Sequence, residues 1–452
     1  MLNSALKRNI FKTNIVAYQW GFDIEMDNGI ERVKEEIRPI LADFYKKSRE
    51  NFIPGKSKVM VGRPIFDEKE VLSVLESFLK KRLSQGKCVE KFEKQFSDYI
   101  NVEYSVAVNS GTSANLLAML ALIENGKVKT GDEVIIPAAT FASVASPIIQ
   151  TGLKPVFVDV DKNSYNIDPK EVQNAISDKT KVIMPVHSLG NPADMKTIME
   201  IANEKGLYVV EDCCESHGAE IDGKKIGSFG HMSTISFFVA HNITTGEGGM
   251  VSTNSEEFND VLISLREFGR VSQKDNEKNR FIKDEKLGYY DKRYVHERLG
   301  YNFRMTDPEA SFGIIQLEKL DKFNDIRIKN ADNLTRNLNQ FEKYFQLPTF
   351  SSNTKHTFYG YVIVIKPDAP FRREELINYL ENNLIETRPF LGGCLPDQPA
   401  FRKENVKVIG NLSVSRHIRD NAFFIGCHPG IGKDQIDYVT EKISSFIKKI
   451  QD

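Results

Sequence analysis

Three short segments carry side chains suited to phosphate binding or proton transfer. Ser110, Gly111 and Thr112 stand between an apolar run and a helical stretch, so their N–H groups and hydroxyls could bind a phosphate. The same residues also suit an ordinary turn and helix N-cap. Asp212 ends another apolar run, at the sheet edge where ligands of open α/β sheets bind, although a strand-end Asp is often a cap or a salt-bridge partner.

The third segment runs from Ser236 to Gly249 and contains His241. An imidazole takes and gives protons near neutral pH, with an ordinary pKa of about 6.5. A histidine in a loop is also often structural. No lysine lies between Lys225 and Lys274, so this segment offers no amine that could bind an aldehyde covalently.

Alternating strand and helix patterns surround these residues. Apolar, β-branched runs predict seven strands, at 104–108, 133–136, 155–158, 182–186, 207–210, 234–238 and 250–252. Helical stretches follow several of them, at 113–124, 141–151, 168–177 and 193–205. Fully apolar strands of this kind predict a mostly parallel sheet covered by helices on both faces.

The remaining chain divides into three predicted parts: an N-terminal helical arm (1–57), a large domain (58–325) and a small C-terminal domain (326–452). The arm has helical periodicity over 29–50, and two helices separated by Gln85-Gly86 are predicted over 66–100. The charged stretch 270–297 predicts a long loop, and 313–343 a long helix. A βαβ-like pattern begins at 356.

Composition excludes several classes of protein. The 452 residues carry a formal net charge of -1, which favours neither a nucleic acid nor a membrane surface as partner. There is no apolar signal segment and no run of transmembrane length, so we expect a cytoplasmic protein. The five cysteines have no metal-binding spacing, and we expect no metal and no disulfide between the adjacent Cys213 and Cys214.

Four motifs, in order, resemble the DegT/DnrJ/EryC1/StrS family of pyridoxal phosphate (PLP) enzymes that act on nucleotide sugars. They are Ser110–Asn115, Glu211–Gly218, Ser236–Gly249 and Gly300–Asp307, and the resemblance runs from about Lys56 to the C-terminus. It implies an α/β fold of type I, like aspartate aminotransferase. Such a fold is a three-layer sandwich with a mostly parallel seven-stranded sheet, followed by a smaller C-terminal α/β domain.

The resemblance also assigns cofactor contacts. Gly111, Thr112 and Ser236 would hold the phosphate, and Asp212 would pair with the pyridine nitrogen. Phe141 would stack on the ring, unless it is a helix core residue, and Glu215 would lie near the cofactor hydroxyl.

Further contacts concern the substrate and a second subunit. Asn302 would reach the phosphate across a homodimer interface, so that two chains share each active site. His187 and Arg388 match substrate-binding positions, and Arg suits contacts with a diphosphate. His187 could equally well be a residue that packs a loop. Arg388 could instead form a surface salt bridge.

Two departures from the family pattern favour its sugar 3-dehydratase branch. His241 stands where the aminotransferases carry the lysine that tethers PLP, and no cysteine lies between 215 and 393, which excludes thiolate ligation of an iron–sulfur cluster in that span.

The resemblance therefore implies C3 deoxygenation of a nucleotide-linked 4-keto-6-deoxyhexose by PLP and its amine form, PMP. Glutamate would supply the amino group, and His241 would transfer protons. Three alternatives stay open: a nucleotide-sugar aminotransferase, a non-catalytic PLP- or nucleotide-sugar-binding homologue, and a dehydratase that receives electrons from a separate protein. The sequence does not identify the nucleotide or the sugar.

Overall fold

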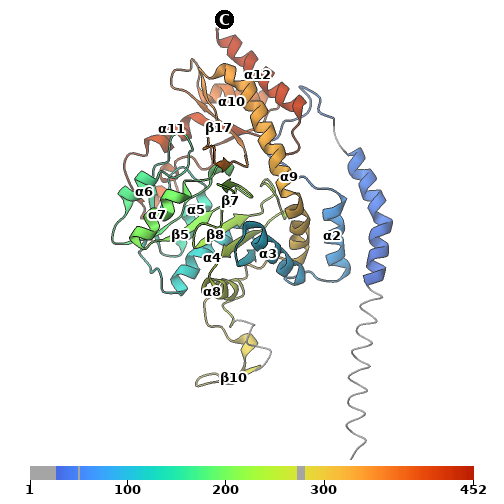
Figure 1. The fold of residues 1–452 in the computed structure, drawn as a ribbon, viewed down its shortest axis with the longest axis vertical. Coiled ribbons are helices and arrows are strands. Elements are labelled where there is room, and N and C mark those ends of the chain that lie inside the picture. The colour runs from blue at the N-terminus through green and yellow to red at the C-terminus, as the bar shows by residue number, and fades with distance from the viewer. Residues whose placement is uncertain (1–26, 49–50, 272–279, 452) are drawn as a thin grey trace, which may run out of the picture.

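The computed structural model describes residues 27–48, 51–271 and 280–451 (Figure 1). Of the predicted N-terminal arm, residues 1–26 and 49–50 lie outside this description. Residues 27–47 form a helix that covers most of the helical segment predicted at 29–50. Its buried face is tied to the body of the protein, because Lys34 Nζ lies 2.6 Å from a carboxylate oxygen of Glu76.

An eight-stranded sheet forms the centre of the molecule, in the order β1-β9-β8-β5-β4-β2-β3-β16. Its strands are β1 (Tyr104–Val108), β2 (Glu133–Pro137), β3 (Lys154–Val158), β4 (Thr180–Ile183), β5 (Tyr208–Asp212), β8 (Met232–Ser236), β9 (Gly249–Thr253) and β16 (Lys407–Val408). Only β9 runs antiparallel to its neighbours. All seven predicted strands are confirmed, and the two-residue β16 adds an eighth at the edge.

The strands are apolar throughout because both faces of the sheet are buried. Along β1, Val106 and Val108 pack into one core, whereas Ala107 between them packs into another. Along β2, Ile136 and Ile135 divide in the same way. Since successive side chains of a strand point to opposite faces, two covered faces require an unbroken apolar run.

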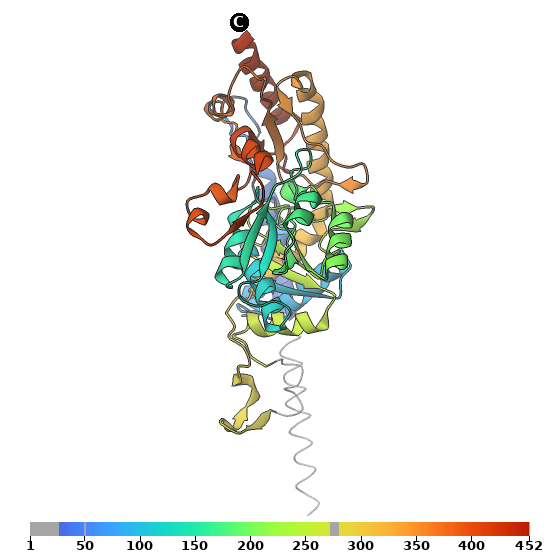
Figure 2. The same cartoon turned by 90° about the vertical axis from the view of Figure 1, so that its left-hand side faces the viewer.

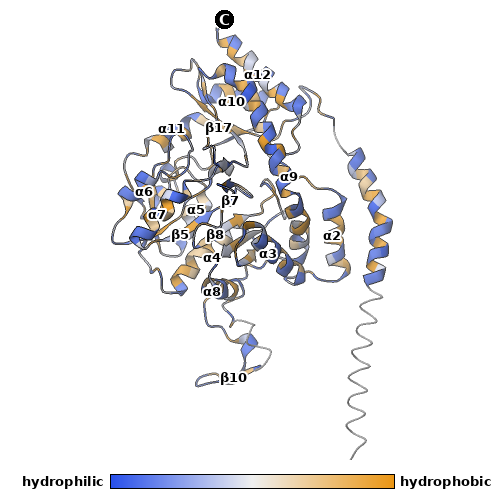
Figure 3. Ribbon diagram, viewed as in Figure 1, coloured by the Kyte–Doolittle hydropathy of each residue, from blue (hydrophilic) through white to orange (hydrophobic). Residues whose placement is uncertain are grey.

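Helices form the two outer layers. One face is covered by α4 (Gly111–Glu124), α5 (Ala142–Gln150) and α8 (Glu256–Arg266), and the other by α3 (Lys87–Ile100), α6 (Pro169–Ala175), α7 (Met195–Lys205) and the first half of α9 (Asp307–Leu338). Helix α2 (Glu68–Leu79) packs outside α9 (Figures 1 and 2). Figure 3 shows that the surface helices alternate between hydrophilic and hydrophobic residues, as amphipathic helices do.

A second sheet lies beside the central one and is entirely antiparallel. Its order is β12-β14-β17-β15, with bounds Phe345–Gln346, Tyr361–Ile365, Ala422–Ile425 and Thr387–Pro389. Its core is closed by α10 (Arg373–Asn382), α12 (Lys433–Gln451) and the second half of α9. Further elements are α11 (Ser413–Asn421) and a small sheet of β6 (Glu220–Ile221), β7 (Lys224–Lys225) and β13 (Thr354–Lys355).

These elements confirm the predicted fold class, a three-layer α/β sandwich with a smaller α/β unit. The domain boundaries stay a prediction, and α9 runs across the one at 325/326. The long loop predicted over 270–297 differs from the structure, because Phe281–Asp284 and Gly288–Asp291 pair as the hairpin β10–β11 (Figure 2). Its exposed strands bury no alternating apolar face, so the pattern used to detect strands is absent.

Candidate active site

A cavity of about 350 Å³ opens at the carboxyl ends of β5 and β8, beside the N-terminus of α4. Of the ten residues predicted for the site, the structure brings seven together in its wall: Gly111, Thr112, Phe141, Asp212, Glu215, Ser236 and His241. The other three, His187, Asn302 and Arg388, do not line it.

The start of α4 forms one wall of the cavity. Ser110 is its N-cap and accepts a hydrogen bond from the Ser113 N–H. A Cβ added at Gly111 would lie 2.5 Å from the Ser236 Cβ, so only glycine lets the helix approach this strand end. The first N–H groups of a helix have no partners within the helix, and they favour an anion. With the hydroxyls of Thr112 and Ser236, this wall suits a phosphate.

Asp212 lines the same cavity from the end of β5. One carboxylate oxygen accepts a hydrogen bond from the Asn115 side-chain amide at 2.9 Å, and the other from the Cys214 N–H at 3.0 Å. Asn115 is itself held by the Ser143 carbonyl. A carboxylate has about four lone-pair positions, so Asp212 is oriented and still able to accept a hydrogen bond from a ligand.

Glu215 lies three residues after Asp212 and lines the same cavity. Burial raises its pKa to about 8, and the negative charge of Asp212 raises it too. A hydrogen bond from the Leu189 N–H, at 3.0 Å, opposes this shift. At neutral pH Glu215 is therefore mostly protonated and can donate a hydrogen bond.

One ring nitrogen of His241 forms a hydrogen bond, and the other forms none to a described residue. Its Nδ1 lies 2.8 Å from the Ser236 carbonyl oxygen, and a carbonyl only accepts, so Nδ1 carries the proton of the neutral ring. Its Nε2 makes no hydrogen bond to any described residue and holds a lone pair at the cavity wall. This is the tautomer of a base that acts through Nε2.

Burial, with a smaller contribution from the positive charge of Arg327, lowers the pKa of His241 to about 4, although the hydrogen bond to the Ser236 carbonyl opposes the shift. The sequence led us to expect an ordinary value near 6.5; the lower value means that the ring is neutral over the whole physiological range. The imidazolium formed after proton uptake would be a correspondingly stronger acid.

A second imidazole shares the same carbonyl. His217 Nε2 lies 2.9 Å from the Ser236 oxygen, and its ring centroid lies 5.9 Å from that of His241. Burial, and then the neighbouring His241, lowers the pKa of His217 to about 3. His217 therefore stays a neutral donor, and the Ser236 carbonyl is held rigidly between two N–H groups.

Two aromatic side chains complete the cavity. Phe141 is the N-cap residue of α5 and is 57% exposed, which excludes the interpretation as a helix core residue and leaves its ring available to a ligand. Tyr359 comes from the smaller unit, and its ring meets that of His241 edge to face at 5.4 Å. Arg327 holds its backbone by donating to the Tyr359 carbonyl at 3.2 Å.

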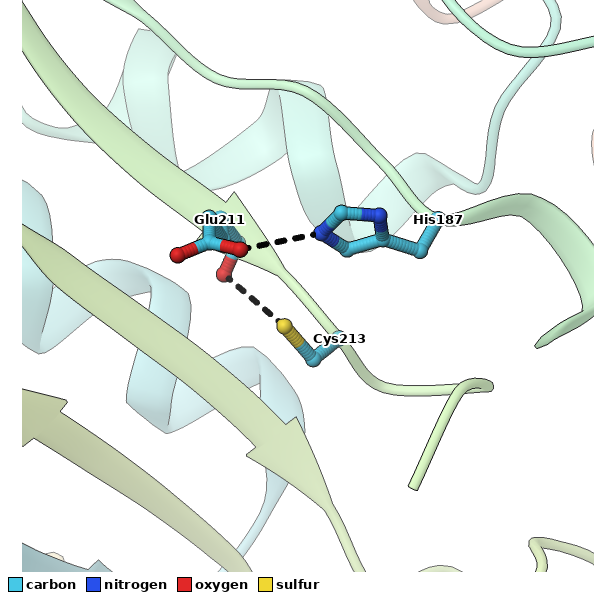
Figure 4. Close-up of side chains that lie close together, drawn as sticks. All are labelled: His187, Glu211 and Cys213. Carbon is cyan, nitrogen blue, oxygen red and sulfur yellow. Dashed lines mark hydrogen bonds and ion pairs between the residues drawn. The ribbon is translucent and has the colours of Figure 1, made fainter. Parts of the chain in front are cut away.

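His187 lies behind this cavity, in a buried cluster with Glu211 and Cys213 (Figure 4). Its Nδ1 accepts the Ala193 N–H, so Nε2 carries the proton and donates to Glu211 at 3.2 Å. Backbone N–H groups donate three more bonds to that carboxylate, from Gly227, Phe229 and Gly230. With four donors on the Glu211 carboxylate and both nitrogens of His187 in use, neither of these two residues has a lone pair left for a cation, and His187 packs the loop.

Asn302 and Arg388 also lie away from the cavity. Asn302 is exposed and accepts a hydrogen bond from Arg304, whereas Arg388 pairs with Glu386 and has a side chain 52% exposed. Neither contacts the cavity of its own chain. Both are accessible from outside.

Several residues that shape the site were not predicted from the sequence. Tyr359 is distant in sequence and stands in no recognised motif, and Asn115 and His217 occur inside motifs without an obvious role. A buried polar side chain is expected to have a partner, but that partner is visible only in three dimensions.

The cavity fits PLP on this chain's own geometry. The cavity is lined by the N-terminus of α4, which suits an anion, and by Gly111, which allows the helix to approach Ser236 closely. It is also lined by the carboxylate of Asp212, which can still accept a hydrogen bond from a ligand. No lysine lines this space in the described part of the chain.

The model of the DegT/DnrJ/EryC1/StrS aminotransferase family matches residues 64–444, and the chain belongs to this family. It is 35% identical over 428 residues to the lipopolysaccharide biosynthesis protein RfbH of Salmonella typhimurium, covering 92% of this chain and 98% of that protein. It is also 35% identical to the dTDP-4-dehydro-2,6-dideoxy-D-glucose 3-dehydratase of Saccharopolyspora spinosa, covering 92% of each.

The comparisons also include an aminotransferase and a PLP-bound structure. GDP-perosamine synthase of Escherichia coli O157:H7 is 33% identical, over 80% of this chain and 91% of that protein. The E. coli GDP-4-keto-6-deoxy-D-mannose-3-dehydratase with bound hydrated PLP superposes with a TM-score of 0.78 at 31% identity, covering 85% of this chain and 98% of that one. The chain is thus a member of a PLP-dependent family of sugar-modifying enzymes. No helix in the described ranges is long and apolar enough to cross a membrane.

Proposed function

We propose that this protein removes the C3 hydroxyl of a nucleotide-linked 4-keto-6-deoxyhexose, with PLP and PMP as cofactor forms and glutamate as reductant. The observation that carries the proposal is the base at the cavity. His241 presents an unprotonated Nε2 to the cavity that Asp212 also lines, and no described lysine lines it. A base without a tethering amine suits proton transfer and elimination, and leaves the cofactor held only by non-covalent contacts.

The cofactor would supply an electron sink next to the sugar and exchange an amino group with glutamate. Gly111, Thr112 and Ser236 would bind its phosphate, and Phe141 would pack on its ring. Asp212 would hold the proton on the pyridine nitrogen, for which Asn115 and Cys214 already orient it. Glu215, protonated at neutral pH, would donate to the cofactor hydroxyl.

His241 would move the proton of the reaction. Its Nε2 would take up a proton at the reacting centre and give it to the departing C3 hydroxyl, while the Ser236 carbonyl, itself held by His217, keeps the ring in place. The overall reaction balances without a separate electron carrier: sugar and glutamate give the 3-deoxysugar, 2-oxoglutarate and ammonia. This agrees with the absence of cysteines from 215 to 393, and we propose that no iron–sulfur cluster takes part.

The proposal includes a homodimer. Asn302 is exposed and lies outside the cavity of its own chain, as a residue reaching a partner's cofactor phosphate would. Arg388, also exposed, would meet the nucleotide diphosphate. His187 has no free nitrogen for a substrate, and its role in the proposal is to hold Glu211 and the adjoining loop.

Aminotransfer is the competing function, favoured by the similarity to GDP-perosamine synthase. Product mass separates the two. The purified protein would be incubated with PLP, glutamate and a panel of nucleotide-linked 4-keto-6-deoxyhexoses. Loss of one oxygen from the sugar, with 2-oxoglutarate and ammonia released, is the expected result and identifies the nucleotide. Gain of an amino group at C4 would overturn the proposal.

A further inference from the structure

A second and larger cavity, of about 470 Å³, lies between the helix at 27–47 and helices α2, α3 and α9. It shares no lining residue with the active-site cavity. Figure 1 shows the helix at 27–47 standing beside α2 and α9, on one side of the molecule. The volume falls within the range of about 300–1,000 Å³ that small-molecule sites occupy.

Positive charge is concentrated around this cavity. Seven of its sixteen lining side chains are Lys or Arg and two are Glu, a balance of +5 in a chain whose net charge is -1. Two of the cations, Lys34 and Lys80, are paired with Glu76. The other five form no ion pair within the described part of the chain: Arg38, Lys69, Arg82, Lys87 and Lys91. Clustered like charges repel one another, and an anion between them removes that cost.

The inner wall has a different character. Leu72, Ile314 and Ile315 line it with apolar surface. Ser77, 3% exposed, faces the Cys88 thiol, and its hydroxyl has no hydrogen-bond partner within bonding distance among the described residues. A buried hydroxyl without a partner is uncommon, and a ligand group in this cavity would provide one.

We propose that this cavity binds a nucleoside polyphosphate, at a site separate from the active site. The cations around the cavity would bind the phosphates, and the apolar wall with Ser77 would take the nucleoside. Lys34 and Arg38 belong to the helix at 27–47, so the ligand would also fasten that helix to α2 and α3. Binding at this cavity does not depend on the proposed sugar chemistry.

The test is calorimetric titration of the full-length, PLP-loaded protein at low salt with ATP, inorganic pyrophosphate and adenosine separately. PLP would occupy only the cofactor-phosphate part of the active site, so ATP bound in the active site is told apart by its indifference to a charge reversal in this cavity, with which it shares no lining residue. ATP is expected to bind more tightly than either part alone. In the double variant Lys87→Glu/Lys91→Glu the dissociation constant for ATP should rise about tenfold, which corresponds to 1.4 kcal/mol.

A matched control, Lys129→Glu/Lys170→Glu, makes the same change of charge at two exposed lysines outside both cavities. It should leave the constant within about twofold, since exposed charges at a distance are screened. An equal loss in both variants would assign the binding to diffuse charge and overturn the site. Absence of ATP binding, or pyrophosphate binding as tightly as ATP, would overturn the nucleoside polyphosphate assignment.

Discussion

Two carboxylate–imidazole sets draw their carboxylates from the end of β5, with one imidazole from the segment after β4 and the other from the segment after β8, and they differ in how many lone pairs are in use. Glu211 accepts four hydrogen bonds, and both nitrogens of His187 are occupied. Glu215 accepts one bond from a backbone N–H, and His241 has its Nε2 free. The first set is saturated by its own chain, whereas the second is prepared for something that the chain does not supply.

The difference explains why residue type alone does not identify a catalytic group. His187 is buried and His241 half-buried near the sheet edge, and both occur in motifs that suggested a role in the site. Only the uncommitted nitrogen can exchange a proton with a ligand. The saturated set contributes stability, because every buried N–H that it accepts would otherwise lack a partner.

Removal of the free nitrogen should have the largest effect on activity. His241→Asn keeps an N–H donor for the Ser236 carbonyl but has no base, so we expect kcat to fall about 10³-fold. The melting temperature and PLP content should stay close to those of the native protein. His417→Asn, on α11 outside the cavity, is the control and should leave kcat unchanged. A decrease in kcat below tenfold for His241→Asn would remove this residue from the proton transfer.

A substitution in the Glu211–His187 set should lower stability and leave kcat nearly unchanged. Glu211→Gln places an amide NH₂ against backbone N–H donors, and the free energy of unfolding should fall by about 3 kcal/mol in a urea titration. The kcat of the folded fraction should change less than about threefold. Glu204→Gln, which alters an exposed pair with Lys205, should cost less than about 0.5 kcal/mol. Equal costs for the two variants would contradict a structural role for Glu211.

The smallest expected effect is the pH dependence of stability from Glu215. Its folded pKa of about 8 lies above the ordinary 4.5, so the folded state binds the extra proton between these values. The native protein should therefore lose stability as pH rises from 5 to 8, whereas Glu215→Gln lacks this loss. The melting-temperature advantage of the variant should grow by about 3 °C across this window. A constant difference would mean that Glu215 is not protonated in the folded protein.

Much of the fold could be predicted from local pattern. The seven central strands are unbroken apolar runs because both faces of the sheet are covered, and such runs are visible in sequence. The hairpin β10–β11 escaped prediction because its exposed strands have no buried face to mark them. The eighth strand, β16, is two residues long and joins the sheet from a distant part of the chain.

The candidate site was predicted less completely. Gly111, Asp212, Ser236 and His241 meet because strand ends and a helix start converge at one sheet edge, which the order of elements already implies. The saturation of His187 depends on N–H groups from two loops, and the low pKa of His241 depends on burial and Arg327. These are tertiary properties that spacing along the chain does not encode.

We propose that a histidine in place of a tethering lysine makes this cavity eliminate a hydroxyl rather than transfer an amine. The most direct measurement compares product masses from the native protein and His241→Lys, each with PLP, glutamate and the same 4-keto sugar nucleotide. We predict that the native product has lost one oxygen and that the variant product has gained an amino group. An aminated product from the native protein, or dehydration by the variant at the native rate, would contradict the claim.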